Sequence, residues 1–153
     1  GDLLSDCAAM LTGSLGMRDS KWISRADNPK NRGFVTTARD LARFGLLIMS
    51  QGNWAGKNLG CTPEYFEEML SPSSELNPTY GLLWWLNDSV EFRGRTGSPV
   101  PTAPPDAVVS IGALGRKLYV TRSTGLVVAR LGNRTSPQFD NELWRLIKDA
   151  QVR

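Results

Sequence analysis

Apolar residues recur at helical spacing over positions 1–70 of the chain. Segment 2–11 predicts a first helix with one apolar stripe, formed by Leu3, Leu4, Cys7, Ala8 and Leu11. Segment 36–52 predicts a second helix, in which Thr37 stands three residues before Asp40, as in a capping box, and Gly52 suits the end. The apolar stripe of this second helix consists of Ala38, Leu41, Ala42, Gly45, Ile48 and Met49.

Two further helices are predicted, one on each side of a region rich in strands. Segment 62–70 predicts a short helix because Thr62 can cap it and Pro63 takes the first helical position. Segment 137–150 predicts the last helix. Its expected apolar stripe consists of Phe139, Leu143, Leu146 and Ile147.

Between these helices the pattern changes to that of strands. Segment 79–87 is short and aromatic, which favours a strand. Segment 93–106 contains four prolines and predicts a surface loop. Runs 118–121 and 126–131 predict a hairpin, with Gly125 able to take a positive φ in the turn. Because both runs are apolar on both faces, we expect central strands that helices cover on each side.

Composition places the chain among globular proteins with one core, since 41% of its 153 residues are hydrophobic and 22% are charged. The net charge of +3 comes from 18 basic and 15 acidic residues, which are interleaved along the chain. This interleaving indicates a solvated surface, so we expect no nucleic-acid partner. No apolar run is long enough for a membrane span, and the residues leave the compartment open between periplasmic, secreted and cytoplasmic.

The chain contains no histidine, which removes the Ser-His-Asp and Cys-His arrangements and the histidine-based zinc motifs. The two cysteines, Cys7 and Cys61, do not stand in a metal-ligand spacing. They are interpreted as two reduced thiols, with a single disulfide as the alternative. We therefore expect no metal and no cofactor.

Four segments in this order resemble a known family: "GSLGM" at 13–17, "GFVTTARDLARFG" at 33–45, "YGLLWW" at 80–85 and "GALGRKLYVTRSTGLVVARLGN" at 112–133. The set is similar to the C-terminal half of the serine β-lactamase-like hydrolases, which include class C β-lactamases, D-Ala-D-Ala peptidases and esterases. Within this group it looks most similar to the branch of the esterases and the 6-aminohexanoate-dimer hydrolase.

The resemblance implies an α+β fold, in which helices flank an antiparallel β-sheet and an all-helical lobe stands beside it. The helical lobe would occupy residues 1–77, and residues 78–153 would supply the C-terminal strands and helix. In the family both chain ends build the sheet. This chain would therefore contribute about three strands, leave one sheet edge uncovered and be prone to association.

The family attacks its substrate with the serine of an S-x-x-K motif, and a tyrosine of a Y-x-N motif helps to manage the proton. Neither motif occurs in this chain, because no serine has lysine at the third following position and none of Tyr65, Tyr80 and Tyr119 begins Y-x-N. In the family both motifs precede the matched segments. The resemblance thus implies that the N-terminal half of the same protein is the partner that carries the nucleophile.

A third family motif, Lys-Thr-Gly or His-Thr-Gly, corresponds to Ser110, Ile111 and Gly112 when counted back from Tyr119 and Val120. The resemblance implies that these three residues bind substrate and that the backbone N–H of Ala113 is one half of an oxyanion hole. A Cβ at Gly112 would collide with the substrate backbone along this strand. Ser110 replaces a cation that holds the substrate carboxylate in β-lactamases, which favours small ester or amide substrates without that carboxylate.

Several simpler interpretations stay open at this point. The segment "SIGALG" could be a strand entrance with a glycine bulge, and "RTG" at 95–97 is interpreted as a coincidental likeness to Lys-Thr-Gly. Asn87 and Asn133 begin triplets that match glycosylation acceptors. Four cations, Arg93, Arg95, Arg116 and Lys117, are interpreted as solvated charges. The alternative to a hydrolase is an inert binding or scaffolding relative of that family.

Overall fold

The computed structural model describes residues 3–25, 28–59, 62–88, 91–92, 95–96 and 98–151. Within these ranges the chain is an α+β protein with four α-helices and antiparallel strand pairs. The helices are α1 (Leu3–Leu15), α2 (Ala38–Met49), α3 (Pro63–Met69) and α4 (Phe139–Gln151), and a 3₁₀ turn, η1, covers Ala113–Gly115. The strands are β1 (Lys21–Arg25), β2 (Asn28–Val35), β3 (Asn53–Trp54), β4 (Lys57–Asn58), β5 (Trp85–Leu86), β6 (Glu91–Phe92), β7 (Arg95–Thr96), β8 (Val108–Ile111), β9 (Lys117–Thr121) and β10 (Leu126–Arg130).

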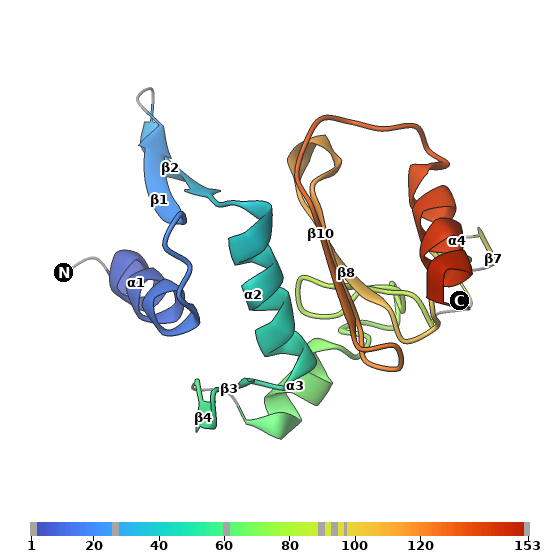
Figure 1. The fold of residues 1–153 in the computed structure, drawn as a ribbon, viewed down its shortest axis with the longest axis horizontal. Coiled ribbons are helices and arrows are strands. Elements are labelled where there is room, and N and C mark those ends of the chain that lie inside the picture. The colour runs from blue at the N-terminus through green and yellow to red at the C-terminus, as the bar shows by residue number, and fades with distance from the viewer. Residues whose placement is uncertain are drawn as a thin grey trace.

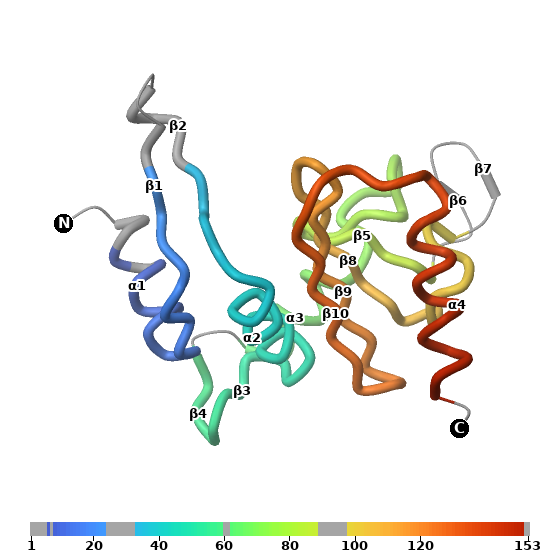
Figure 2. Tube along the Cα trace, turned by 45° about the horizontal axis from the view of Figure 1, so that its top comes forward, coloured from blue at the N-terminus to red at the C-terminus, as the bar shows by residue number. Residues whose placement is uncertain are grey.

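The main sheet has four strands in the order β10-β9-β8-β5, all antiparallel to their neighbours. Helix α2 packs on one face of this sheet and α4 on the other, as Figure 1 shows. Helix α1 and the β1–β2 hairpin lie on the side of α2 that faces away from the sheet (Figure 2). The expected cover of helices on both faces is confirmed, but of the two predicted central strands only β9 is central, because β10 is the edge strand of this sheet in the described residues.

The hairpin predicted near the end of the chain is also confirmed. Strand β9 pairs with β10 in a register that sets Thr121 opposite Leu126 and Lys117 opposite Arg130. Gly125 closes the turn with a φ of 64°. Strand β8 pairs with the other edge of β9, so that three consecutive strands bring residues 108–130 together at the centre of the fold.

Side chains of β9 alternate between two cores, as the period of a strand requires. Leu118 and Val120 face α2 and α3, where Ile48, Phe66 and Trp84 complete one core. Tyr119 faces α4 and joins the second core, which includes Trp144, Val109, Val100, Ala103 and Ala107. The helix-to-sheet approach is close because Gly45 of α2 lies against the sheet, where a Cβ would be 2.5 Å from Cγ1 of Val127.

The apolar stripe predicted for α4 was wrong for Leu146 and omitted Trp144, while Phe139, Leu143 and Ile147 are partly buried. Leu146 is 52% exposed, whereas Trp144 is 2% exposed and stacks edge-to-face on Tyr119 with ring centroids 5.5 Å apart. The indole has far more apolar surface than leucine, so burying it sets the rotation of the helix. Ile147 packs against the same core, as expected.

The all-helical character expected for residues 1–77 was wrong for residues 21–25 and 28–35. They form the antiparallel hairpin of β1 and β2, in which Trp22 pairs with Phe34 and the two rings lie 5.2 Å apart. The aromatic cross-strand pair favours a hairpin over a helix. The division of the chain near residue 77 stays a prediction.

Segment 79–87 forms much less strand than predicted. Only Trp85 and Leu86 belong to β5, while Tyr80 makes an isolated bridge to Trp85. The residues between them turn sharply: Gly81 donates to the carbonyl of Trp84, and Leu83 takes a positive φ of 69°. Gly81 also lies against backbone, since a Cβ there would be 2.4 Å from the carbonyl oxygen of Met69.

The helix ends follow the predicted capping residues. The hydroxyls of Thr37 and Thr62 accept hydrogen bonds from the third following N–H, which are those of Asp40 and Tyr65. Gly52, with a φ of 84°, follows the end of α2 and donates to the carbonyl of Leu47. One half of the expected capping box is missing, because the Asp40 carboxylate binds groups of another segment.

The loop over residues 98–107 is held by the buried side chain of Asn87, which is 4% exposed. The match of the Asn87 triplet to a glycosylation acceptor is coincidental, since the amide of Asn87 is enclosed and binds this loop. Cys61, the side chain of Cys7 and Gly97 of the "RTG" triplet lie outside the described residues. In the described ranges no helix is long and apolar enough to cross a membrane.

Candidate functional site

The predicted site residues lie where strand β8 ends and its connection to β9 begins. Ser110 and Ile111 are the last two residues of β8 and pair with Leu118 and Lys117 of β9. On the other edge, β5 pairs only with Val108 and Val109. Within the described part of the chain, no strand therefore continues the sheet beside Ser110 and Ile111.

The backbone of Ile111 faces this open edge. The carbonyl of Ala107 accepts a hydrogen bond of 3.0 Å from the Asn87 N–H, on the β5 side of the strand. Backbone groups alternate in direction along a strand, so those of Val109 and Ile111 face the same side as those of Ala107. The N–H and C=O of Ile111 are thus oriented to pair with an added extended segment.

The side chains of the two residues point to opposite faces of the sheet. Ser110 shares its face with Val108, which belongs to the core under α2 and α3. Ile111 lies on the α4 face and is 47% exposed. A hydroxyl at position 110 is thus presented on the side of the sheet where the helices of residues 1–77 pack.

A tight turn follows the open edge. The Gly112 N–H donates to the carbonyl of Arg116 at 2.8 Å, and the Arg116 N–H donates to the carbonyl of Ala113 at 3.3 Å. Between them, Leu114 and Gly115 both take positive φ values, 61° and 73°. The N–H of Ala113, at the start of the 3₁₀ turn, makes no hydrogen bond to any part of the chain that the structure describes. An exposed, unpaired N–H at this place can bind an anionic oxygen.

Gly112 has no packing reason to be a glycine. Its φ is −99°, and an added Cβ would meet only the Arg116 backbone and Cβ at 3.8 Å, an ordinary contact. The glycine-bulge interpretation of "SIGALG" finds no support, because the register of β8 with β9 is continuous through Ile111. A requirement for glycine here would have to come from something that approaches the strand from outside.

A polar cluster supports the β9 side of this turn. Lys117 forms an ion pair with Asp140, and the Tyr119 hydroxyl donates to the same carboxylate at 2.7 Å. Burial, together with the hydrogen bond to Asp140, raises the pKa of Tyr119 far above its ordinary value. The phenol stays protonated and cannot act as a general base. The interpretation of Lys117 as a solvated charge was wrong, since its side chain is 12% exposed.

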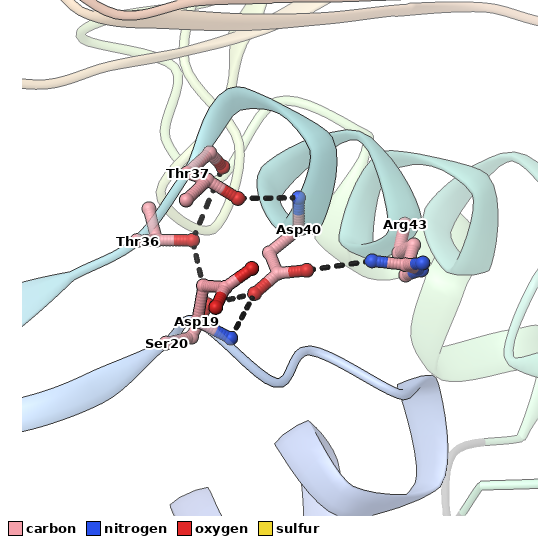
Figure 3. Close-up of polar contacts among 6 residues, drawn as sticks. All are labelled: Asp19, Ser20, Thr36, Thr37, Asp40 and Arg43. Carbon is pink, nitrogen blue, oxygen red and sulfur yellow. Dashed lines mark hydrogen bonds and ion pairs between the residues drawn. The ribbon is translucent and has the colours of Figure 1, made fainter.

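The most enclosed carboxylate, Asp40, belongs to a structural cluster on the other side of α2 (Figure 3). It accepts hydrogen bonds from the Asp19 N–H and the Ser20 hydroxyl, both at 2.9 Å, and from Arg43 at 2.6 Å. Burial alone would raise the pKa of this carboxyl, but these donors outweigh it and hold the pKa below its usual range. Each carboxylate oxygen is occupied, so the cluster ties the β1–β2 hairpin to the start of α2 rather than offering a reactive group.

A cleft of about 390 Å³ lies between α1, the β1–β2 hairpin and α2. Its walls are almost wholly apolar and include Leu11, Met17, Trp22, Phe34, Leu41 and Phe44. The Thr12 hydroxyl, which also lines it, already donates to the carbonyl of Ala8 at 2.8 Å. The cleft therefore offers no free polar group for orienting a reacting substrate. Within the described ranges, no three His, Cys, Asp or Glu side chains are grouped as they would be to hold a metal ion.

The sequence pointed to the end of β8 and to Ala113 but did not indicate the turn that follows or the residue behind it, Arg130. Its guanidinium donates to the carbonyl of Gly115, the last residue of the 3₁₀ turn η1. The signal was present in "LVVAR", where a cation ends a strand that is otherwise apolar on both faces. A charge at such a position requires partners, and the partners here belong to the turn.

Comparison with protein families found no family that matches this chain. A 32-residue segment is 66% identical to the 3-isopropylmalate dehydrogenase of Rhodospirillum rubrum (strain ATCC 11170 / ATH 1.1.1 / DSM 467 / LMG 4362 / NCIMB 8255 / S1). This match covers 21% of the chain, and the chain spans 9% of the length of the dehydrogenase. So short a match does not extend over a domain, and no activity is carried over from it.

Proposed function

We propose that this chain is part of a serine hydrolase of the β-lactamase-like group, which acts through an acyl-enzyme on small ester or amide substrates. In this proposal the end of β8 aligns the substrate and the Ala113 N–H is one donor of the oxyanion hole. The serine nucleophile, with the lysine and tyrosine that manage its proton, would come from the N-terminal half of the same protein. The fold would then be that of the β-lactamases and transpeptidases.

The observation that carries the proposal is the continuity between the open edge and the free N–H. An extended substrate segment paired with the backbone of Ile111 would run directly towards Ala113. Its carbonyl oxygen would then meet the Ala113 N–H. An oxyanion hole needs two donors, and the N–H of the nucleophilic serine would supply the second.

Two residues at this edge, Gly112 and Ser110, bear on the choice of an ester or amide substrate without a carboxylate next to the scissile bond. Gly112 leaves room for a substrate backbone against the strand, since the nearest atoms that the described residues bring to the place of its Cβ are those of Arg116 at 3.8 Å. Ser110 offers a hydroxyl where β-lactamases of the resembled group carry a cation. A neutral hydroxyl can accept or donate a hydrogen bond but attracts a carboxylate much less than an ammonium does.

The absence of histidine from the sequence agrees with this chemistry, because a lysine and a tyrosine can replace imidazole as the proton-transfer groups. Tyr119 cannot take the role of that tyrosine, since its hydroxyl is buried and donates to Asp140. Lys117 cannot take the role of the lysine, because it is paired with the same carboxylate. Both groups would have to be supplied from outside the described residues.

A second candidate is an inert binding or scaffolding relative of the same hydrolases. Ser110 in place of Lys or His favours it, because loss of the cation can mark loss of catalysis. In that case the open edge of β8 would bind an extended segment without cleaving it.

The test is active-site labelling of the whole protein, including any N-terminal half, with a fluorophosphonate probe followed by intact-mass analysis. We expect one probe molecule on a serine of an S-x-x-K motif that precedes this chain, and none on the isolated 153-residue chain. Heat-denatured protein and protein preincubated with an ester substrate serve as controls. A folded whole protein that takes up no probe would exclude the hydrolase and favour the binding relative.

A further inference from the structure

We infer that Arg130 is a positioning residue, which holds the turn of residues 112–116 in the geometry that presents the Ala113 N–H. This inference rests on the proposed function for its catalytic consequence. Its structural part, that one guanidinium orders the turn, can be tested on the chain alone.

The guanidinium of Arg130 joins the turn to the connection that follows β10. Its Nη1 donates to the Gly115 carbonyl at 2.6 Å, and its Nη2 donates to the Asn133 carbonyl at 2.5 Å. Because the donor is ionised, both are charge-assisted hydrogen bonds. The guanidinium carbon also lies 4.9 Å from the centre of the Phe139 ring at the start of α4. One side chain therefore fixes three segments that are separate in sequence.

The backbone curves around this guanidinium at two glycines. Gly115 and Gly132 take φ values of 73° and 149°, which other residues rarely adopt. Added Cβ atoms would lie 3.7 Å from Nη1 and 3.6 Å from Nη2, respectively. Both glycines therefore lie beside the guanidinium in conformations that a residue with a side chain would adopt only with strain.

The turn has few other restraints. Its own hydrogen bonds are those between Gly112 and Arg116 and between Arg116 and Ala113. Leu114 takes a positive φ, which costs about 1 kcal/mol or more for a residue with a Cβ. Leu114 is 41% exposed, so core packing contributes little to hold it. The hydrogen bond from Arg130 is therefore the principal side-chain restraint on the part of the turn that carries Leu114 and Gly115.

Lysine cannot replace this residue. Its ammonium carries three donors on one nitrogen at the end of a flexible stem, whereas the guanidinium reaches the two carbonyls from two nitrogens in a fixed plane. We therefore expect a lysine at position 130 to hold the two carbonyls less firmly than arginine does. Arg130→Lys should therefore order the turn of residues 112–116 less well than wild type, although the net charge is the same.

The first experiment measures amide hydrogen exchange by NMR in the 153-residue chain for wild type, Arg130→Lys and Arg130→Met. We expect the Gly112 and Arg116 amides to lose about ten-fold or more of their protection in Arg130→Met and less in Arg130→Lys. The amides that pair Thr121 with Leu126, at the far end of the hairpin, should stay protected. Arg145→Met is the matched control, because among the described residues Arg145 forms ion pairs with the exposed Glu142 and Asp149 of α4.

Unchanged protection at residues 112–116 in both variants would overturn the inference. Loss of protection over the whole sheet in Arg130→Met would show a global effect. In that event Arg130→Lys, which keeps the charge, must show the local loss or the inference fails.

The second experiment measures ester hydrolysis by the whole protein with the same variants. A displaced oxyanion donor reduces the stabilisation of the transition state more than it reduces the affinity for substrate. We therefore expect kcat to fall about ten- to a hundred-fold in Arg130→Met. KM should stay within about two-fold of wild type. A fall in kcat/KM through KM alone would contradict the positioning role. If wild type itself hydrolyses no ester, the proposed function fails, while the exchange result still decides whether Arg130 orders the turn.

Discussion

The side-chain amide of Asn87 and the backbone of Val100 form two hydrogen bonds in opposite directions. Nδ2 donates to the Val100 carbonyl at 3.0 Å, and Oδ1 accepts from the Val100 N–H at 2.9 Å. The same Nδ2 also binds the carbonyls of Ala103 and Pro104. One side chain thus supplies hydrogen-bond partners for several backbone groups of a loop that has no regular structure and lies beside β5 and β8.

Replacing Asn87 with alanine should destabilise the protein by about 3 kcal/mol, because several buried backbone groups lose their partner. Equilibrium unfolding in urea measures the change. The control is Asn141→Ala, which removes solvent-exposed hydrogen bonds to Thr102 of the same loop. This substitution should lower the unfolding free energy by less than about 1 kcal/mol. Equal effects of the two substitutions would contradict the structural role given to Asn87.

Gly112→Ala separates the folding role of this glycine from its proposed functional role. The unfolding free energy should stay within about 1 kcal/mol of wild type, since φ is −99° and the new Cβ meets atoms only at 3.8 Å. Hydrolysis by the whole protein should fall at least about ten-fold, because the methyl group would stand where the substrate backbone lies. Both quantities are measured on the same preparation, and full activity in Gly112→Ala would remove the reason given for the glycine.

Ser110→Lys should shift substrate preference towards molecules that carry a carboxylate. The new ammonium would stand at the open edge of β8, and a charge-assisted hydrogen bond is worth about 1.5 kcal/mol or more. The ratio of kcat/KM for a β-lactam to that for a neutral ester should therefore rise about ten-fold. Ser110→Met, similar in length but uncharged, is the control. An unchanged ratio in Ser110→Lys would place Ser110 away from the substrate.

Gly45→Ala should destabilise the packing of α2 on the sheet by about 1–3 kcal/mol, although alanine is the better helix former. The added methyl would lie 2.5 Å from Cγ1 of Val127 and 2.9 Å from Cδ1 of Leu118. Gly13→Ala is the matched control, because Gly13 is exposed in α1 and nothing lies within 4 Å of its Cβ position. That control should raise stability by up to about 1 kcal/mol, as measured by thermal or urea unfolding.

Asp40 should make stability depend on pH in the acid range. Its pKa is lowered in the folded protein, so its contribution is complete above the unfolded pKa of about 4 and is lost as the pH falls through the folded value. Asp40→Asn should cost about 2 kcal/mol at pH 7. The difference from wild type in urea unfolding should shrink between pH 5 and pH 2. A constant difference over this range would show that the charge contributes nothing.

The sequence by itself determined the elements whose signals are local. Thr37 and Thr62 begin their helices at the predicted positions because a hydroxyl before the first turn satisfies a free N–H, whatever the rest of the chain does. Apolar runs around Gly125 likewise predicted the hairpin of β9 and β10, since a turn residue and two strands lie within a few positions of each other.

Only the tertiary structure decided the features that depend on partners distant in sequence. The rotation of α4 about its axis depends on the contact between the Trp144 and Tyr119 rings in the core. The carboxylate of Asp40 likewise accepts hydrogen bonds from Asp19 and Ser20 instead of completing a capping box. Because β5 is short, Ser110 and Ile111 lie at an open edge of the sheet. Arg130, at the end of β10, donates to the carbonyl of Gly115, which lies fifteen residues earlier in the sequence. Periodicity along a chain records burial, but the direction of a hydrogen bond or the end of a strand depends on which groups folding brings within reach.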